Sequence, residues 1–259
     1  MSLVDDLLSV RARPGRLAPP SETRPLSLAE AYATQDRLRE ALLARGERLA
    51  GWKAGLTNRA TQAMFGAEGP VCGFLLASGV FPSRAEVSVA RFGALVVEAE
   101  VAFVLRRDLA GPGVTAATAL LAVEGALPAL ELVDLRYTGK PVASDVVADG
   151  VHGNAIVLGA SLTDVAHLDL ALEGLVYELN GAVVATNTAA EVMGNPLNSL
   201  AWLANHLGSR GLALRAGELV MSGSVSALLR PTAGDTVLAT FTRLGAVSAR
   251  FVDGGFVMS

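Results

Sequence analysis

The spacing of apolar and polar residues predicts an α+β fold that begins with helices. Ser27 and Glu30 have the spacing of a capping box, and apolar residues follow at helical intervals until Gly46. We therefore expect an amphipathic helix of about 18 residues from this cap. Residues 49–58 then resemble a short strand around Lys53, followed by a turn of helix over residues 59–65.

From about residue 85 the pattern changes to short strands separated by turn signals. Asn180-Gly181 is typical of a tight hairpin, and Asn195-Pro196 is typical of a helix start. Thr115 is expected to cap a helix that runs to about residue 126. Two segments are expected to be irregular, the turn at 70–76 and a loop over the site at 136–150. Strands are expected at residues 86–89, 95–105, 155–158, 219–224, 236–241 and 244–251.

We expect one compact unit with two parts, because the chain shows no repeat and no flexible linker. Residues 1–84 form a helical N-terminal region that carries the Lys53 segment. Residues 85–259 form a β-rich core, which is the predicted metal-binding and catalytic part.

Two carboxylates interrupt the most apolar predicted strand. Glu98 and Glu100 stand two apart within residues 95–105, so their side chains point to the same face of the strand. Two unpaired buried carboxylates are costly, and each raises the pKa of the other. A basic partner, a shared proton or a metal ion would relieve that cost.

A third carboxylate, Glu131, lies in the apolar segment 128–135. Three carboxylates offer only oxygen ligands, which suit Mg²⁺ or Mn²⁺ rather than zinc or copper. The alternative is that one or more of these glutamates pairs with an arginine on a solvated sheet face. Spacing alone does not join Glu131 to Glu98 and Glu100, so both interpretations stay open at this point.

Lysine and histidine add further candidates. Lys53 lies between Gly51 and Gly55, which is typical of a place where a ligand approaches the backbone, although an edge-strand lysine reaching water is the alternative. His152 lies in a polar stretch after Glu131. The three histidines, His152, His167 and His206, lack the spacing of zinc ligands.

Composition narrows the classes of partner. Apolar residues make up 51% of the 259-residue chain, and a net charge of −4 leaves no basic footprint for nucleic acid. A single cysteine, Cys72, excludes an internal disulfide, and the cytoplasm is the expected setting. We expect neither a signal peptide nor a membrane span, because no apolar run approaches about 20 residues.

Several segments occur in the order of a known family. Together they resemble the 2-keto-4-pentenoate hydratase / 4-oxalocrotonate decarboxylase family, within the fumarylacetoacetate hydrolase superfamily. The resemblance covers roughly residues 27–252. The segments are residues 51–57, 98–105, 128–136, 145–149, 194–204, 214–223, 234–235 and 244–248.

The resemblance implies a β-roll or distorted sandwich with helices outside. It implies Mg²⁺ or Mn²⁺ on Glu98, Glu100 and Glu131, with Lys53 as the active-site lysine. The implied substrate is a short 2-oxo or 2-hydroxy-dienoate acid from the meta-cleavage of aromatic compounds. A homo-oligomer and an associated enzyme of the same pathway are also implied.

Hydratase, decarboxylase and hydrolase activities remain alternatives. The segment 194–204 is closer to the hydratase branch, which adds water to a 2-hydroxy-2,4-dienoate. The alternatives are 2-oxo-acid decarboxylation, hydrolysis of an acylpyruvate, and a non-catalytic partner subunit. Intact Lys53 and glutamates argue against the last.

One departure from the family pattern concerns the tail of the substrate. The family has Asn-Ala-Ser-Ser after the aspartate that corresponds to Asp149, with a serine near the substrate. This chain has Gly150, Val151, His152 and Gly153 there. The histidine is expected to donate a proton or to pair with a second carboxylate.

Overall fold

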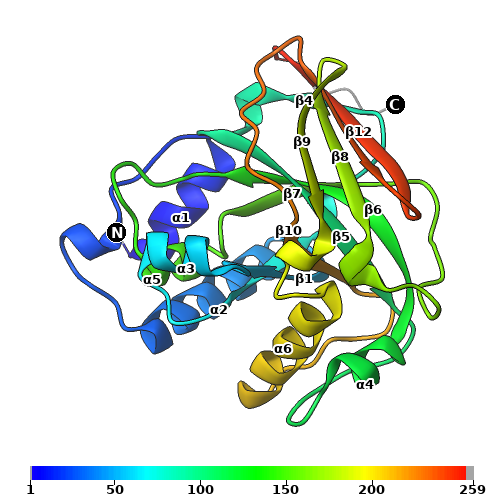
Figure 1. Ribbon diagram of the computed structural model, residues 1–259. Helices are drawn as coiled ribbons and strands as arrows, with labels where there is room; N and C mark the ends of the chain where they lie inside the picture. Colours follow the sequence, from blue (N-terminus) through cyan, green and yellow to red (C-terminus); the bar gives the residue numbers. More distant parts are fainter. Residues whose placement is uncertain (1, 255–259) are drawn as a thin grey trace.

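A seven-stranded mixed sheet forms the centre of the protein in the computed structural model, which describes residues 2–254 (Figure 1). The strand order is β2-β1-β10-β5-β6-β7-β3. The pairs β1/β10 and β3/β7 are parallel, and the other pairs are antiparallel. The strands are β1 (Leu49–Gly55), β2 (Val71–Leu76), β3 (Val80–Pro82), β5 (Leu95–Leu105), β6 (Val123–Asp134), β7 (Gly153–Leu158) and β10 (Leu219–Ser224).

A second sheet of five strands packs against the first near β6, in the order β4-β12-β11-β8-β9. The buried Tyr177 links the two sheets, because its hydroxyl donates to the carbonyl oxygen of Val97 at 3.2 Å. The main hydrophobic core includes residues of both sheets and of the helices that pack against them. The strands are β4 (Ala85–Ser88), β8 (Gly174–Leu179), β9 (Ala182–Thr188), β11 (Thr236–Phe241) and β12 (Gly245–Val252).

Most helices lie outside the sheets. In Figure 1, α1, α2, α3 and α5 gather at one side of the molecule, with β8, β9 and β12 at the other. The predicted caps Ser27, Asn58, Thr115 and Asn195 all accept backbone hydrogen bonds at helix starts. The α-helices are α1 (Leu3–Ala12), α2 (Leu28–Ala44), α3 (Arg59–Phe65), α4 (Ala116–Leu120), α5 (Ala143–Ala148) and α6 (Pro196–Ser209). Short 3₁₀ helices are η1 (Pro20–Glu22), η2 (Ala77–Gly79), η3 (Val89–Arg91), η4 (Leu170–Leu172) and η5 (Ala189–Glu191).

The expectation of a turn at residues 70–76 is wrong, because this segment forms strand β2. Gly73 does not turn the chain but pairs with Lys53 on β1. A Cβ added to Gly73 would lie 2.5 Å from the carbonyl oxygen of Gly150. Glycine here allows close backbone packing within a strand, which sequence alone does not distinguish from a turn.

The expectation of a helix up to residue 126 is also wrong. The helix that Thr115 caps ends at Leu120, and β6 begins at Val123. Strand β6 pairs with β5 over nearly its whole length. Tertiary pairing with a long buried strand overrides the local preference of the Ala- and Leu-rich sequence.

The predicted loop over residues 136–150 contains a short helix, α5. The carboxylate of Asp145 accepts hydrogen bonds from the backbone of Val142 and from Ser21, so it ties α5 to the N-terminal segment. Val146 and Val147 are buried, and α5 packs against α2. Packing rather than sequence periodicity therefore makes this stretch helical.

The two predicted parts of the chain share one sheet, since β1 pairs with β10 and β3 pairs with β7. The boundary at residue 84 stays a prediction. Cys72 is fully buried, which raises the pKa of its thiol to about 12. Within residues 2–254, no helix is long and apolar enough to cross a membrane.

Candidate active site

Antiparallel pairing of β5 and β6 brings the three predicted glutamates together. Glu98 and Glu131 stand directly opposite each other across the two strands, and Glu100 lies two positions along β5. One carboxylate oxygen from each residue lies within 4.8 Å of the other two. The register of β5 and β6 thus places Glu131 beside Glu98 and Glu100, which spacing along the chain could not predict.

These carboxylates are short of partners. Glu100 and Glu131 are buried, yet Glu100 Oε1 and Glu131 Oε2 have no hydrogen-bond partner among residues 2–254. The backbone N–H of Gly223 on β10 donates to Glu100 Oε2 at 2.8 Å. Unpaired buried carboxylate oxygens are costly, and an oxygen-only set of this size fits a hard divalent cation.

Repulsion and burial perturb the pKa of these groups. Burial raises the pKa of Glu98 to about 7, with a further contribution from Glu131, while Lys53 opposes the shift. The pKa of Glu100 lies well above its usual range, first through burial and then through repulsion by Glu131 and Glu98. Without a cation, the cluster therefore favours bound protons over full ionisation.

Lys53 reaches this cluster from β1. Its Nζ forms a buried ion pair with Glu131 and donates to the carbonyl oxygen of Val151 at 3.0 Å. Strand β1 lies three strands away from β6, about 14 Å in a flat sheet, which exceeds the reach of a lysine side chain. The sheet must therefore curve around the site to allow this contact.

The charge of Lys53 is held in place by its neighbours. Burial lowers the pKa of Lys53, but the attraction of Glu131, Glu98 and Glu100 outweighs burial and keeps this pKa above its ordinary value.

The glycines on either side of Lys53 leave room for neighbouring segments of the protein to pack closely. A Cβ on Gly51 would overlap the carbonyl of Leu219, and a Cβ on Gly55 would lie 2.5 Å from Val151 Cγ1.

A cavity of about 490 Å³ opens beside the carboxylates. Lys53, Glu98 and His152 line it, so the structure brings the predicted lysine and histidine to the same space as the cluster. Helix α3 and residues 224–228 after β10 form other walls. The walls carry many apolar side chains, among them Leu56, Met64, Phe65, Val96, Val133, Leu135 and Leu228.

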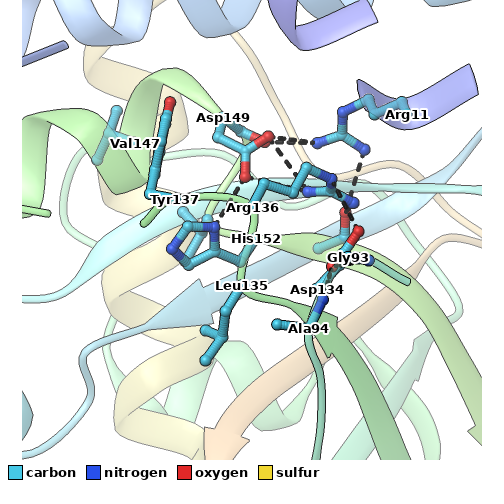
Figure 2. A network of polar contacts seen from close by, with 12 residues as sticks. Arg11, Gly93, Ala94, Asp134, Leu135, Arg136, Tyr137, Val147, Asp149 and His152 are labelled. Carbon is cyan, nitrogen blue, oxygen red and sulfur yellow. Dashed lines mark hydrogen bonds and ion pairs between the residues drawn. The ribbon is translucent and has the colours of Figure 1, made fainter. Parts of the chain in front are cut away.

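His152 is held by an aspartate that the sequence-based prediction did not assign to the site. Its Nδ1 lies 2.8 Å from Asp149 Oδ2, and its ring packs edge-on against Tyr137. Figure 2 shows Asp149 between Arg11 and His152. His167 lies on an exposed loop and His206 packs between Trp202 and Tyr32, so neither belongs to this cavity's walls.

Two buried arginines complete this network and were also not foreseen. Arg136 Nη1 contacts both oxygens of Asp149, at 3.0 and 3.2 Å, and its Nε lies 3.3 Å from Asp134 Oδ2. Arg11, from α1, reaches the same aspartate. Arg136 and Asp149 have apolar sequence neighbours, a signal that could have identified them as buried charged residues. Nothing in the local sequence distinguishes Arg11.

Burial raises the pKa of Asp149, but Arg136 and Arg11 outweigh burial and hold that pKa well below its usual range. Asp149 is therefore a carboxylate at neutral pH. An ionised acceptor at Nδ1 keeps the hydrogen on that ring nitrogen, which leaves Nε2 as the atom available to a ligand.

The sequence pattern of the fumarylacetoacetate (FAA) hydrolase C-terminal family matches residues 48–252. The chain belongs to this family. The match spans the lysine strand, all three glutamates and both sheets.

Individual relatives narrow the comparison. The chain is 36% identical over 228 residues to 4-oxalocrotonate decarboxylase of Pseudomonas sp. (strain CF600), covering 88% of this chain and 86% of the relative. It is 35% identical over 241 residues to 2-hydroxyhexa-2,4-dienoate hydratase of Comamonas testosteroni, covering 92% and 91%.

A solved structure agrees in fold over nearly the whole chain. The structure of 4-oxalocrotonate decarboxylase from Pseudomonas putida G7, complexed with magnesium and adipate, superimposes with a TM-score of 0.93 at 32% identity. The comparison covers 96% of each chain. The predicted α+β fold of the fumarylacetoacetate hydrolase type is thereby confirmed.

Proposed function

We propose that this protein is a divalent-metal-dependent hydratase. It would add water to a 2-hydroxy-2,4-dienoate, of the 2-oxopent-4-enoate type, to give a 4-hydroxy-2-oxo acid. The proposed reaction is a step in the catabolism of aromatic compounds by meta-cleavage, and relatives named as hydratases of 2-hydroxydienoates support it.

The observation that carries this proposal is the glutamate cluster at the cavity. When fully ionised, three carboxylates against the single ammonium of Lys53 would leave two uncompensated negative charges, which a divalent cation would neutralise. Glu98, Glu100 and Glu131 would hold Mg²⁺ or Mn²⁺. When bound, the ion would stabilise negative charge on the C2 oxygen of the substrate as a Lewis acid.

Lys53 is the proposed orienting and proton-transfer group at the acid end. Its Nζ lies beside the carboxylates, and Lys53 lines the cavity, so it can hold the carboxylate of a 2-oxo acid. As an ammonium it can also donate its proton toward the C2 oxygen when negative charge develops there. A Schiff base is not needed, because the cation already supplies the electron sink.

His152 is the proposed acid and base at the other end. Protonation of C5 by water, with loss of the C2 hydroxyl proton to water, first converts the dienol into a 2-oxo-3-enoate. The oxygen of water then bonds to C4, the C3=C4 electron pair shifts toward the C2 carbonyl, and the water proton passes to His152 Nε2. Return of that proton to C3 completes the 4-hydroxy-2-oxo acid and regenerates the histidine.

The cavity walls favour a substrate without a second carboxylate. They are largely apolar, and Lys53 is already paired with Glu131. Arg230 also lines the cavity, but it is exposed at the surface. A decarboxylase of 4-oxalocrotonate must bind a second carboxylate, which calls for a cation within the cavity.

Decarboxylation of a 2-oxo acid is the second candidate. The high structural similarity to the decarboxylase from Pseudomonas putida G7 favours it. In that reaction the bond between the distal carboxylate and its neighbouring carbon breaks, CO₂ leaves, and the electron pair is delocalised toward the C2 oxygen.

Product analysis with the metal-loaded protein tests the proposal. Freshly generated 2-hydroxypenta-2,4-dienoate should give 4-hydroxy-2-oxopentanoate with Mg²⁺ or Mn²⁺, and no product after chelation. Turnover that survives chelation would contradict the metal mechanism. Release of CO₂ from 4-oxalocrotonate without hydration of the dienoate would favour the decarboxylase.

The setting and assembly of the enzyme remain predictions. We expect it to work in the cytoplasm as a homo-oligomer, alone or with another enzyme of its pathway. Sedimentation of the purified chain, alone and with such a partner, tests the assembly.

A further inference from the structure

We propose that Arg11, on the N-terminal helix α1, is a positioning residue for His152. This inference rests on the proposed function, in which His152 carries protons at the tail end of the substrate. Arg11 lies outside the residues 48–252 that match the family. It reaches the site from more than 130 positions away in the sequence.

The turn that carries His152 needs outside support. Gly150, Val151 and His152 have φ values of 77°, 58° and 53°, so three successive residues adopt the left-handed conformation. Glycine adopts it freely, but a β-branched residue such as Val151 does so only under strain. Such a backbone persists when its surroundings hold it in place.

Arg11 bridges the two residues that flank this turn. Its Nη2 donates to the carbonyl oxygen of Asp149 at 2.5 Å, and its Nη1 donates to the carbonyl oxygen of Gly153 at 3.1 Å. A planar guanidinium can hold two acceptors in a fixed relation, whereas a lysine ammonium cannot reproduce that fork. One side chain thereby bridges the two ends of the turn.

The same arginine supports the partner of the imidazole. Its Nη2 lies 3.3 Å from Asp149 Oδ1, while Asp149 Oδ2 lies 2.8 Å from His152 Nδ1. Arg11 therefore contacts one carboxylate oxygen and the histidine contacts the other (Figure 2). Loss of Arg11 would remove one support of the turn and one support of the aspartate that orients the ring, while Arg136 still contacts both oxygens of that aspartate.

Burial of Arg11 is not explained by helix packing. Helix α1 already buries Leu7, Leu8 and Val10, while the Arg11 side chain is only 10% exposed and its Nε has no hydrogen-bond partner in the described part of the chain. Burial and the nearby Arg136 lower the pKa of Arg11 to about 10, so the guanidinium remains charged at neutral pH. A cation buried with an unmet donor is a costly way to anchor a helix.

Arg136 does not make Arg11 redundant. Arg136 contacts the Asp149 carboxylate and the carbonyl oxygen of Gly153, but only Arg11 contacts the carbonyl oxygen of Asp149 among these two. Of the two arginines, only Arg11 therefore holds the backbone of Asp149, the residue that precedes the turn. We therefore expect a change in the position of His152, and not loss of the whole network, when Arg11 is replaced.

Kinetics of the Mg²⁺-loaded enzyme test this inference. Arg11→Met should lower kcat for the dienoate by about 10- to 100-fold, because a small displacement of a proton-transfer group is costly. KM should stay within about threefold, since the acid end is untouched. Arg11→Lys should recover part of the loss. Arg13→Met, an exposed arginine at the same end of α1, is the matched control and should keep native kcat.

Nitrogen NMR of the histidine rings supplies a readout that needs no turnover. The chain has three histidines, so substitution of each assigns the signals. The native His152 ring should show one tautomer with the hydrogen on Nδ1, and Arg11→Met should show averaged ring shifts. Native kcat or native His152 shifts in Arg11→Met would each overturn the inference.

Binding of pyruvate to the Mg²⁺-loaded variants separates local from global effects. Arg11→Met should keep the native number of binding sites. Loss of sites in proportion to kcat would mean unfolding, and would overturn a positioning role. If the native protein hydrates no dienoate, the proposed function fails, while the NMR comparison still decides whether Arg11 positions His152.

Discussion

The two ends of the cavity are built on different principles. At the acid end, neighbouring strands bring Glu98, Glu100 and Glu131 together, and their negative charge exceeds what Lys53 can balance. At the tail end, a turn presents His152, and its charges are balanced within the protein. Arg11 and Arg136 there face Asp134 and Asp149.

The two ends therefore differ in whether their charges need a ligand for balance. A bound ligand can neutralise a surplus of buried charge, so the acid end is suited to binding a cation. A balanced network requires no ligand and serves instead to hold a side chain in one orientation. At the acid end, removal of a carboxylate should therefore lower turnover more than it lowers the stability of the fold. Removal of the Asp149 carboxylate should lower the stability of the fold more than it lowers turnover.

The largest expected effect on catalysis is at the acid end. Glu100→Gln should lower turnover of the dienoate by at least about 10³-fold, equivalent to about 4 kcal/mol of barrier, because it removes a ligand of the cation. It should not destabilise the metal-free protein, since a crowded buried carboxylate disappears. Measurements of kcat and of urea unfolding without metal check both.

Glu124→Gln, an exposed glutamate at the start of β6, is the control and should leave turnover unchanged. Marked destabilisation of metal-free Glu100→Gln would contradict the idea that this end carries surplus charge.

The largest effect on folding is expected at the tail end. Asp149→Ala should destabilise the protein by about 3–5 kcal/mol, because Arg11 and Arg136 then remain buried without their common partner. Urea unfolding at constant Mg²⁺ measures this. Asp253→Ala, at an exposed position, should be neutral. A change below about 1 kcal/mol in Asp149→Ala would show that the network does not support the fold.

Replacement of His152 should have an intermediate effect. His152→Ser should lower kcat for the dienoate by about 10- to 100-fold, as expected for loss of a proton carrier, and should leave pyruvate binding intact. His167→Ser, on an exposed loop, is the matched control. Unchanged kcat with an altered preference among dienoates would instead make His152 a residue that selects the substrate tail.

The smallest expected effect is on the pH dependence of stability. Glu98 has a folded pKa of about 7 against an ordinary value of 4.5, so the folded state holds its proton more tightly. Stability of the metal-free protein should therefore fall as pH rises from 4.5 to 7. We expect a loss of about 1–2 kcal/mol, reduced from the full shift because Glu98 is partly exposed.

Asp149 should act in the opposite sense. Its pKa is depressed below the ordinary value of 3.8, so its contribution is present above that pH and is lost as pH falls further. Thermal unfolding between pH 3 and pH 8, with and without Mg²⁺, checks both signs. A metal-free protein that becomes more stable between pH 5 and pH 7 would contradict the description of the acid end.

Local signals in the sequence predict much of the fold. The residue pairs at helix starts, such as Ser27 with Glu30, act within a few positions and predict their helices well. Predictions failed where distant contacts decide the outcome. Residues 123–126 become part of a strand because β5 pairs with them, and Gly73 belongs to a strand because the turn at Gly150 packs against it.

The sequence alone predicts the carboxylates of the acid end, because charged residues in apolar segments are unusual, whereas the register of β5 and β6 joins Glu131 to Glu98 and Glu100. Glu98 and Glu100 stand out locally, and Glu131 lies in a similar setting. Only the tertiary structure decided which residues serve the tail end. Arg11, Arg136 and Asp149 meet through folding of distant segments, and a charge balanced by long-range partners leaves no pattern along the chain.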